Sequence, residues 1–402
     1  MKPRRIAGAL TALLAAVGLC GGIWPFAEGE TKPVTKLTVT PEEFGGYPSD
    51  GEDDTEALLQ ALATGKTVQL SGGVYEVSAP LSLTDQTLIG AGTSSTTISS
   101  SCADALQPIL QLGGRCTVSD IAFQFEEKLI QYTERQGERV AIRLGNGQLA
   151  DGSQLRNLRF TQIGTALYAP DEDGAGVSRL LADTLFVGDY GYRAVDFRKS
   201  GQYGNTFSNL YIGGRANLEH ARSAGFAVEG EEFNLTVEQL NLEHYFFDSA
   251  LLLKNCHGAR FGSIHMEASG QSAPGTGLIR LENSDAFLEA VTLYYNPQDY
   301  PNCGVIELGT AGTSEGNYLE IGTLHLKGLN NVHPSNGTPR DGGLNNPNAA
   351  GFKTVCRRAG ATGTYTVKLG AYVWYTWYGD SEIYAAFPCD ENGIRYLSKG
   401  VQ

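Results

Sequence analysis

The sequence predicts an all-β protein in which short parallel strands wind into a β-helix, a solenoid whose turns stack on one another. The first observation is a four-residue pattern of alternating apolar and polar residues, as in 240–243 and 264–267, which lie 24 residues apart (264 − 240). Alternation with a period of two is typical of a strand with one buried face. The pattern recurs at intervals of 24 to 37 residues, at 121–123, 158–160, 185–187, 210–212, 240–242, 264–266, 291–293 and 324–326.

A second series of alternating segments lies between successive copies of the first, at 166–168, 194–197, 226–228, 250–253, 278–281 and 305–308. Two or three short strands in each turn of about 25–30 residues, with no helical pattern between them, indicate a parallel β-solenoid. A propeller fits less well, because its unit of about 40–45 residues carries four strands. Equivalent strands of a solenoid stack about 4.8 Å apart, so aligning the repeats also maps the protein surface.

The composition agrees with this fold class and argues against several partners. A chain of 402 residues suits a solenoid, because each turn contacts only its neighbours. The 51 glycines and the charged fraction of only 18% suit a fold made of tight turns. The formal net charge of −14 argues against nucleic acid and anionic membrane surfaces as partners.

Residues 1–28 are predicted to be a signal peptide or an N-terminal anchor. Lys2, Arg4 and Arg5 precede the apolar run 6–19, which is the order of charge and hydrophobicity found in export signals. Three outcomes stay open: cleavage, a lipoprotein linkage at Cys20, and an uncleaved anchor over 6–26 that is long enough to span a bilayer. In each case we expect an exported protein, secreted or at the cell surface. Any contact with a membrane is expected only through an N-terminal anchor. The oligomeric state is not predicted.

Six cysteines remain once Cys20 is set aside. An even number in an exported chain favours disulfides, although the connectivity does not follow from the spacing. Cys102–Cys116 and Cys356–Cys389 are the pairs we expect first, and the alternative is that the cysteines are buried free thiols in the solenoid core. Their spacing does not resemble a zinc site, and no metal site is predicted.

Residues 41–98 carry the strongest local signature. The acidic segment 53–56 (Asp-Asp-Thr-Glu) is predicted to begin a helix that ends at Gly65. The apolar face of that helix consists of Ala57, Leu58, Ala61 and Leu62. Two strands are expected to follow, at 67–70 and 74–77, with a turn at 71–73 between them.

This stretch resembles the N-terminal region of the pectate-lyase superfamily, which includes polygalacturonase-like enzymes and phage tailspikes. The motifs of that family are Phe-Gly-Ala, Asp-Gly, Asp-Asp-Thr-x-Ala and Gly-x-Tyr. The chain matches them with Phe-Gly-Gly at 44–46, Asp-Gly at 50–51, Asp-Asp-Thr-Glu-Ala at 53–57 and Gly-Val-Tyr at 73–75. The resemblance implies a right-handed parallel β-helix over residues 29–330. It also implies that the acidic cluster belongs to an N-terminal cap rather than to a catalytic site.

Two further segments follow the repeats. Residues 331–350 are rich in Asn, Gly and Pro and are predicted to form a linker loop, and residues 351–402 are predicted to form a small β-rich C-terminal cap. Within that cap, 372–378 holds five aromatic residues among seven. We expect these rings to close the open end of the solenoid, and the alternative is an accessory contact to a sugar.

In the first series, the apolar residues point into the core, so the polar residues between them point outward. Two outward columns result. The first consists of Arg159, Phe186, Tyr211, Asn241, His265, Thr292 and His325. The second consists of Thr161, Gly188, Gly213, Glu243, Glu267, Tyr294 and Lys327. Small and aromatic residues occupy the early turns and reactive side chains the later ones, which predicts a binding groove leading to a reactive centre.

Glu243, Glu267 and His265 are the predicted catalytic residues. Glu243 and Glu267 occupy neighbouring strands, with Cα atoms expected about 4.8 Å apart. Glycoside hydrolysis uses two carboxyl groups in this way, one to protonate the leaving oxygen and the other to attack or to activate water. His265 is placed to orient either group. Substrate contacts are expected from Arg159, Tyr211, Asn241, Tyr294, His325 and Lys327.

Three functions stay open, each with a polysaccharide as the partner. Hydrolysis by the paired carboxylates is favoured and needs no cofactor. Polygalacturonase-like members of the superfamily use Asp residues in motifs that the chain lacks, so the resemblance does not extend to their substrate. The second function is a lyase acting on uronate polymers, with Tyr294, Lys327 or His265 as the base and a cation to neutralise the uronate carboxyl group. For that function the resemblance to the superfamily implies calcium as an optional cofactor. The third is a non-catalytic adhesin at the cell surface that binds a glycan.

Overall fold

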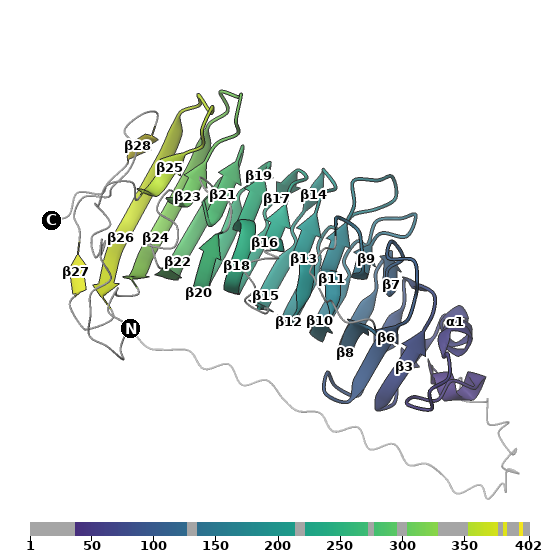
Figure 1. Cartoon of the computed structure of the whole chain (residues 1–402). Helices are drawn as coiled ribbons and strands as arrows, with labels where there is room; N and C mark the ends of the chain where they lie inside the picture. Colours follow the sequence, from purple (N-terminus) through teal and green to yellow (C-terminus); the bar gives the residue numbers. More distant parts are fainter. Residues whose placement is uncertain are drawn as a thin grey trace, which may run out of the picture. The chain divides into compact units, whose positions relative to one another are not determined.

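The computed structural model describes residues 37–126, 135–213, 222–271, 277–295, 304–328, 353–376, 381–383 and 394–396. The predicted signal segment 1–28 and linker 331–350 lie outside these residues. Within them the chain forms a parallel β-solenoid whose strands stack turn upon turn (Figure 1). No helix in the described ranges is long and apolar enough to cross a membrane.

Two ladders of parallel strands run along the solenoid, and they correspond to the two series in the sequence. Ladder 1 begins with β1 (Thr38–Val39), β2 (Thr67–Gln69) and β5 (Thr87–Ile89), and continues through β8 (Thr117–Phe125), β10 (Gln154–Thr161), β12 (Leu181–Val187), β15 (Thr206–Ile212), β18 (Thr236–Lys254), β20 (Ala259–Gln271), β22 (Asp285–Tyr295), β24 (Asn317–Gly328) and β26 (Tyr365–Thr376). Ladder 2 consists of β4 (Leu81–Thr84), β7 (Leu110–Gly113), β9 (Val140–Leu144), β11 (Ile163–Ala169), β13 (Tyr190–Phe197), β16 (Arg222–Val228), the second half of β18, β21 (Ile279–Glu282), β23 (Gly304–Leu308) and β25 (Lys353–Arg357).

The smaller elements complete the turns. β3 (Gly73–Val77) and β6 (Thr96–Ser100) stack on the second half of β8. β14 (Gln202–Tyr203), β17 (Glu232–Phe233) and β19 (Cys256–His257) form a separate three-stranded sheet. β27 (Ser381–Ile383) and β28 (Ile394–Tyr396) pair with β26, the last strand of ladder 1, so they cover part of an edge that would otherwise be open.

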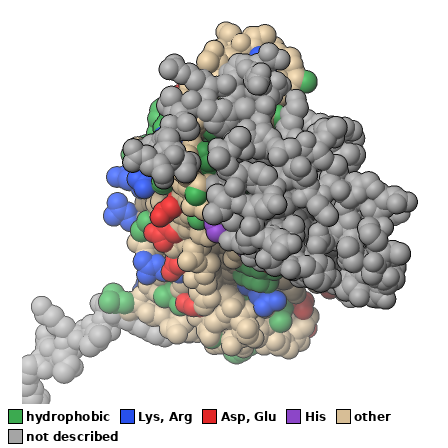
Figure 2. Space-filling model, turned by 90° about the vertical axis from the view of Figure 1, so that its left-hand side faces the viewer, with side chains coloured by type: hydrophobic (Ala, Val, Ile, Leu, Met, Phe, Trp, Pro, Cys, Tyr) green, Lys and Arg blue, Asp and Glu red, His purple; other side chains and the backbone are tan. Residues whose placement is uncertain are grey.

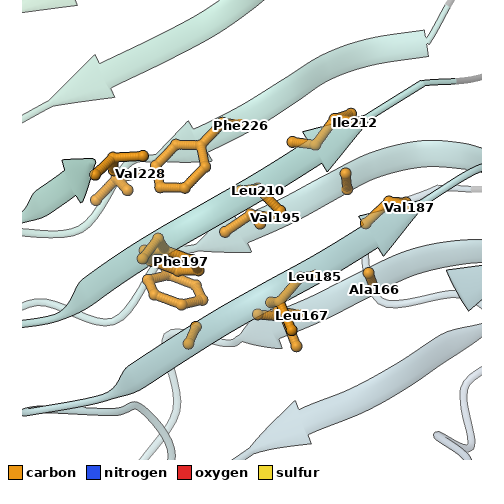
Figure 3. Packing of buried hydrophobic residues seen from close by; sticks show 14 of the residues in the cluster. Ala166, Leu167, Leu185, Val187, Val195, Phe197, Leu210, Ile212, Phe226 and Val228 are labelled. Atoms are coloured by element: carbon orange, nitrogen blue, oxygen red, sulfur yellow. The ribbon is translucent and has the colours of Figure 1, made fainter. Parts of the chain in front are cut away.

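Apolar side chains from the two ladders meet in a continuous core. Leu185 of β12, Leu210 of β15 and Leu240 of β18 occupy equivalent positions in successive strands and are almost completely buried. Val195 of β13 and Phe226 of β16 lie opposite them from ladder 2. Figure 3 shows Leu185, Leu210, Val195 and Phe226 among the side chains packed between the two ladders. The alternation in the sequence therefore predicted the inward face of ladder 1 correctly.

The N-terminal cap forms as the sequence predicted. Helix α1 (Thr55–Ala63) follows the 3-10 helix η1 (Pro41–Phe44), and its apolar face is buried. The carboxylate of Asp53 accepts hydrogen bonds from the Thr55 amide at 2.9 Å and the Ser78 hydroxyl at 2.6 Å. That of Asp54 accepts one from the Glu76 amide at 3.1 Å. The acidic cluster thus fastens the cap to β3 and its following turn.

The C-terminal segment is β-rich, and residues 353–376 stack on the solenoid, because β25 pairs with β23 and β26 pairs with β24. The predicted Cys102–Cys116 disulfide is wrong, since both thiols are free. Cys116 is fully buried and its thiol contacts the Gly113 carbonyl at 3.2 Å, whereas Cys102 lies partly exposed. Cys389 lies outside the described residues, so the Cys356–Cys389 pair stays a prediction.

The outward face of ladder 2 is buried, which the alternation did not predict. Asp196, Glu307 and Arg280 each lie between two core residues, yet they are at most 8% exposed. Arg193 donates to Asp196 at 2.8 Å and also pairs with Glu229. Burial opposes ionisation of Glu229, but the neighbouring guanidinium groups outweigh it and hold its pKa below the usual range. Ladder 1 is therefore the sheet whose outward side chains reach solvent.

Candidate functional site

The structure aligns the first predicted column strand by strand. Arg159, Phe186, Tyr211, Asn241, His265, Thr292 and His325 occupy equivalent positions in β10, β12, β15, β18, β20, β22 and β24. Glu243 pairs with Glu267 in the second column, and Tyr294 pairs with Lys327. The side chains of Tyr294 and Lys327 lie outside the described part of the structure, so their predicted roles stay predictions.

The predicted catalytic residues face outward on one sheet. Leu242 and Met266, which precede Glu243 and Glu267, are fully buried. The Glu243 side chain is half-buried and that of Glu267 is 58% exposed. Since neighbouring strands lie about 4.8 Å apart, the two carboxyl groups are close to each other and open to a ligand.

Below this pair, three side chains of the first column stack on one another. The rings of Phe186 and Tyr211 are parallel, with centroids 4.7 Å apart and planes within 2°. The Arg159 guanidinium carbon lies 4.9 Å from the centre of the Phe186 ring, on the strand at its other side. Both faces of Phe186 are therefore covered, and this ring offers no platform to a sugar. The contact is a cation–π pair of ordinary geometry.

Two glycines let these rings lie down across the sheet. Gly188 follows Phe186 by two residues, and Gly213 follows Tyr211 by two. A Cβ atom at Gly188 would lie 2.6 Å from the Phe186 ring, and one at Gly213 would lie 2.7 Å from the Tyr211 ring. Any side chain in these positions would force the rings to move. The glycines of the second column, which the sequence showed only as small residues, therefore fix where the Tyr211 hydroxyl points.

That hydroxyl reaches the next turn of the solenoid. The Tyr211 Oη donates a hydrogen bond to Glu243 Oε2 at 2.6 Å. Partial burial raises the pKa of Tyr211 to about 12, helped by the hydrogen bond to Glu243 and by the charges of Glu243 and Glu267. The phenol therefore keeps its proton, and remains a donor to Glu243, across the neutral range. The sequence predicted Tyr211 as a substrate contact, but its described partner is Glu243.

His265 lies on the same strand as Glu267 and approaches it from the first column. The distance between His265 Nε2 and Glu267 Oε2 is 3.7 Å, close enough for an ion pair when the imidazole is protonated. Each carboxyl group of the pair thus has a companion of its own, a phenol for Glu243 and an imidazole for Glu267. Two carboxyl groups in unlike surroundings are what acid–base division of labour requires.

Other predicted contacts are present on the same sheet but are not brought together with the pair. Arg159 of β10 is exposed and contacts Phe186 of β12, and β10 lies four strands before β20 in ladder 1. His325 of β24 is half-buried, two strands beyond His265. Among the described residues, no three His, Cys, Asp or Glu side chains lie close enough together to hold a metal ion.

Comparison with known proteins establishes the fold. No protein-family model and no curated protein matches the chain by sequence. The catalytic domain of Agl-KA is similar in structure, with a TM-score of 0.60 over 90% of this chain and 69% of that chain, at 14% identity. The mannuronan C-5 epimerase AlgE4 A-module of Azotobacter vinelandii gives 0.48 over 90% and 100%, at 16% identity. A tailspike of Acinetobacter phage vb_AbaP_AS12 gives 0.48 over 92% and 64%, at 11% identity.

The chain therefore has a parallel β-helix fold, as the resemblance at 41–98 implied. Sequence identity this low extends to the fold alone. The side chains that could carry out chemistry are those on the outward face of ladder 1.

Proposed function

We propose that the protein is an exported β-helix protein that binds a polysaccharide on ladder 1 and hydrolyses it through Glu243 and Glu267. The observation that carries the proposal is the register of β18 and β20, which sets the two carboxyl groups side by side on an open sheet face. Their different companions, Tyr211 at 2.6 Å and His265 at 3.7 Å, support different roles for them. Export rests on the signal-like segment 1–28.

The chemistry divides as follows. Glycosidic bonds break through a transition state with positive charge on the sugar, which one carboxylate stabilises or attacks while the other protonates the leaving oxygen. The Tyr211 hydroxyl donates to Glu243 and fixes the orientation of its carboxyl group, so Glu243 is the proposed nucleophile or base. Glu267, the other carboxyl group of the pair, is the proposed acid, with His265 placed to orient it. No metal is needed for either step.

The test is the pair of substitutions Glu243→Gln and Glu267→Gln in the mature chain. Each keeps the shape of the side chain and removes its ability to carry or release a proton. We expect the rate of glycan cleavage, measured as new reducing ends, to fall roughly 10²–10⁴-fold, the usual contribution of one positioned acid or base. Asp183→Asn is the matched control, because Asp183 is an exposed carboxylate on β12 outside the pair.

Two results would overturn the proposal. Products that absorb in the ultraviolet would show an unsaturated uronate, hence a lyase reaction. A wild-type chain that binds a glycan and leaves its length unchanged during long incubation would be a non-catalytic adhesin.

A further inference from the structure

A hollow lies on β18, β20 and β22, nearer to the starts of these strands than the Glu243–Glu267 pair. It has a volume of about 320 Å³ and is lined by residues of β18, β20 and β22, among them Glu238, Arg260, Gly262, Phe287 and Glu289. Ligand pockets in proteins begin at about 300 Å³, so the hollow accommodates a ligand of roughly one ring. None of these residues belongs to the Glu243–Glu267 pair. Glu243 follows Glu238 by five residues along β18 (243 − 238).

The hollow exists because the middle strand contributes no side chain. Gly262 of β20 lies between Glu238 of β18 and Glu289 of β22. A Cβ atom at Gly262 would lie 2.6 Å from the Glu238 carbonyl oxygen, so no other residue fits without a backbone shift. The glycine thus opens a notch one strand wide, with a carboxylate on either side. Beneath it lie the buried side chains of Val237 and Phe261.

One wall of the hollow carries a positioned cation. The Arg260 guanidinium carbon lies 5.3 Å from the centre of the Phe287 ring, and the two residues pair in register on β20 and β22. Stacking of this kind holds a guanidinium in place while its N–H groups stay available. The side chains of Arg260, Glu238 and Glu289 are exposed, and none of the three makes a side-chain hydrogen bond or an ion pair among the residues that the structure describes.

We infer that this hollow is a subsite for a neutral saccharide, and that the polysaccharide of the proposed function is uncharged. A ligand here must donate to two carboxylates and accept from one guanidinium. Neighbouring sugar hydroxyls do both. A uronate carboxylate would meet Glu238 and Glu289 in the hollow and Glu243 and Glu267 beyond it, in a chain of net charge −14.

This inference rests on the proposed function, because it names the substrate class of that site. It also bears on the alternative chemistry, since elimination requires the acidic proton beside a uronate carboxyl group. A neutral polymer leaves hydrolysis as the available reaction.

The experiment measures binding by the wild-type chain and by Arg260→Gln. The probes are neutral oligomers of glucose, mannose and galactose, together with oligomers of galacturonate and mannuronate, at low ionic strength. Binding is followed by calorimetry and by the NMR signal of the Arg260 side chain. We expect a neutral oligomer to bind, Arg260→Gln to weaken it roughly tenfold, and the uronates to bind more weakly than the neutral oligomer. The double variant Glu238→Gln, Glu289→Gln should bind uronate oligomers with an affinity closer to that for the neutral oligomer.

Arg139→Gln is the matched control, because Arg139 makes the same kind of contact to Phe125, at 5.7 Å, outside the hollow. Three results overturn the inference: uronates that bind at least as tightly as any neutral oligomer, no neutral oligomer that perturbs Arg260, or equal losses for the two arginine variants. These results are separate from the cleavage assay. Neutral oligomers that bind through Arg260 but are not cleaved would refute the proposed hydrolysis alone.

Discussion

Replacing Glu232 with Gln should change how the stability of the protein depends on pH. Glu232 lies on β17, is fully buried, and its two carboxyl oxygens accept hydrogen bonds from the Asn205 side-chain amide at 3.1 and 3.0 Å. Burial raises its pKa from an ordinary value of 4.5 to about 7, although the Asn205 hydrogen bonds partly oppose this. The folded protein therefore holds this proton more tightly than the unfolded chain does.

The sign of the effect follows from proton linkage. Below pH 4.5 both states are protonated at Glu232, and above pH 7 both are ionised. Between these values the folded state binds more protons, so the free energy of unfolding falls as the pH rises. At about 1.4 kcal/mol for each unit of pKa difference, Glu232 removes roughly 3 kcal/mol of stability across this window. Glu232→Gln lacks this titration. Its free energy of unfolding, measured relative to wild type, should therefore increase by roughly 3 kcal/mol as the pH rises from acid to neutral.

The assay is urea unfolding followed by circular dichroism at a series of pH values for wild type, Glu232→Gln and Glu231→Gln. Glu231 is the neighbouring exposed carboxylate and serves as the matched control. Subtracting the wild-type curve removes the contributions of other titrating groups. A difference between Glu232→Gln and wild type that stays flat with pH, or that shrinks toward neutral pH, would refute the reasoning. So would an equal slope for Glu231→Gln.

Two further predictions concern the stacked rings. Tyr211→Phe removes the hydrogen bond to Glu243 but keeps the ring, so the cleavage rate should fall roughly 10–100-fold with little change in KM; an unchanged rate would remove Tyr211 from the mechanism. Gly213→Ala places a methyl group 2.7 Å from the Tyr211 ring and should lower the rate by displacing the hydroxyl. Gly72→Ala, whose nearest contact would be 3.7 Å away, should leave the rate unchanged, and equal losses in both variants would contradict this explanation.

The register of ladder 1 could be predicted from sequence because every turn repeats the same inward alternation. Once Leu210, Leu240 and Ile264 are taken as equivalent, the outward neighbours Tyr211, Asn241 and His265 follow without further information. The same logic placed Glu243 beside Glu267. Because equivalent strands stack in register, aligning the repeats predicts which outward residues are neighbours on the surface.

Sequence alternation predicts which face of a strand a side chain lies on, but not how deeply the side chain is buried or which group it contacts. The pattern marks Asp196 and Glu307 as outward but not as buried, because alternation does not show the arginines that pair with them, Arg193 and Arg198 for Asp196 and Arg358 for Glu307. The spacing of Cys102 and Cys116 says nothing of their side-chain vectors, and Cys116 points into the core. The pairing of 365–376 with β24 does not follow from the repeat interval, because a long Asn- and Gly-rich insertion lies between the two segments.

Under the proposed function, the stacked rings also constrain where a polysaccharide would gain its binding energy. Phe186 has Arg159 on one face and Tyr211 on the other, so the aromatic part of the first column positions Glu243 and leaves no ring face for a sugar. Phe287 differs, because it lines an open hollow together with Arg260. The two arginine–phenylalanine contacts are alike in geometry, at 4.9 and 5.3 Å, and differ in what lies beside them. The notch at Gly262 is therefore open to the proposed ligand, whereas Phe186 and Tyr211 lie across Gly188 and Gly213 and fill the corresponding space there.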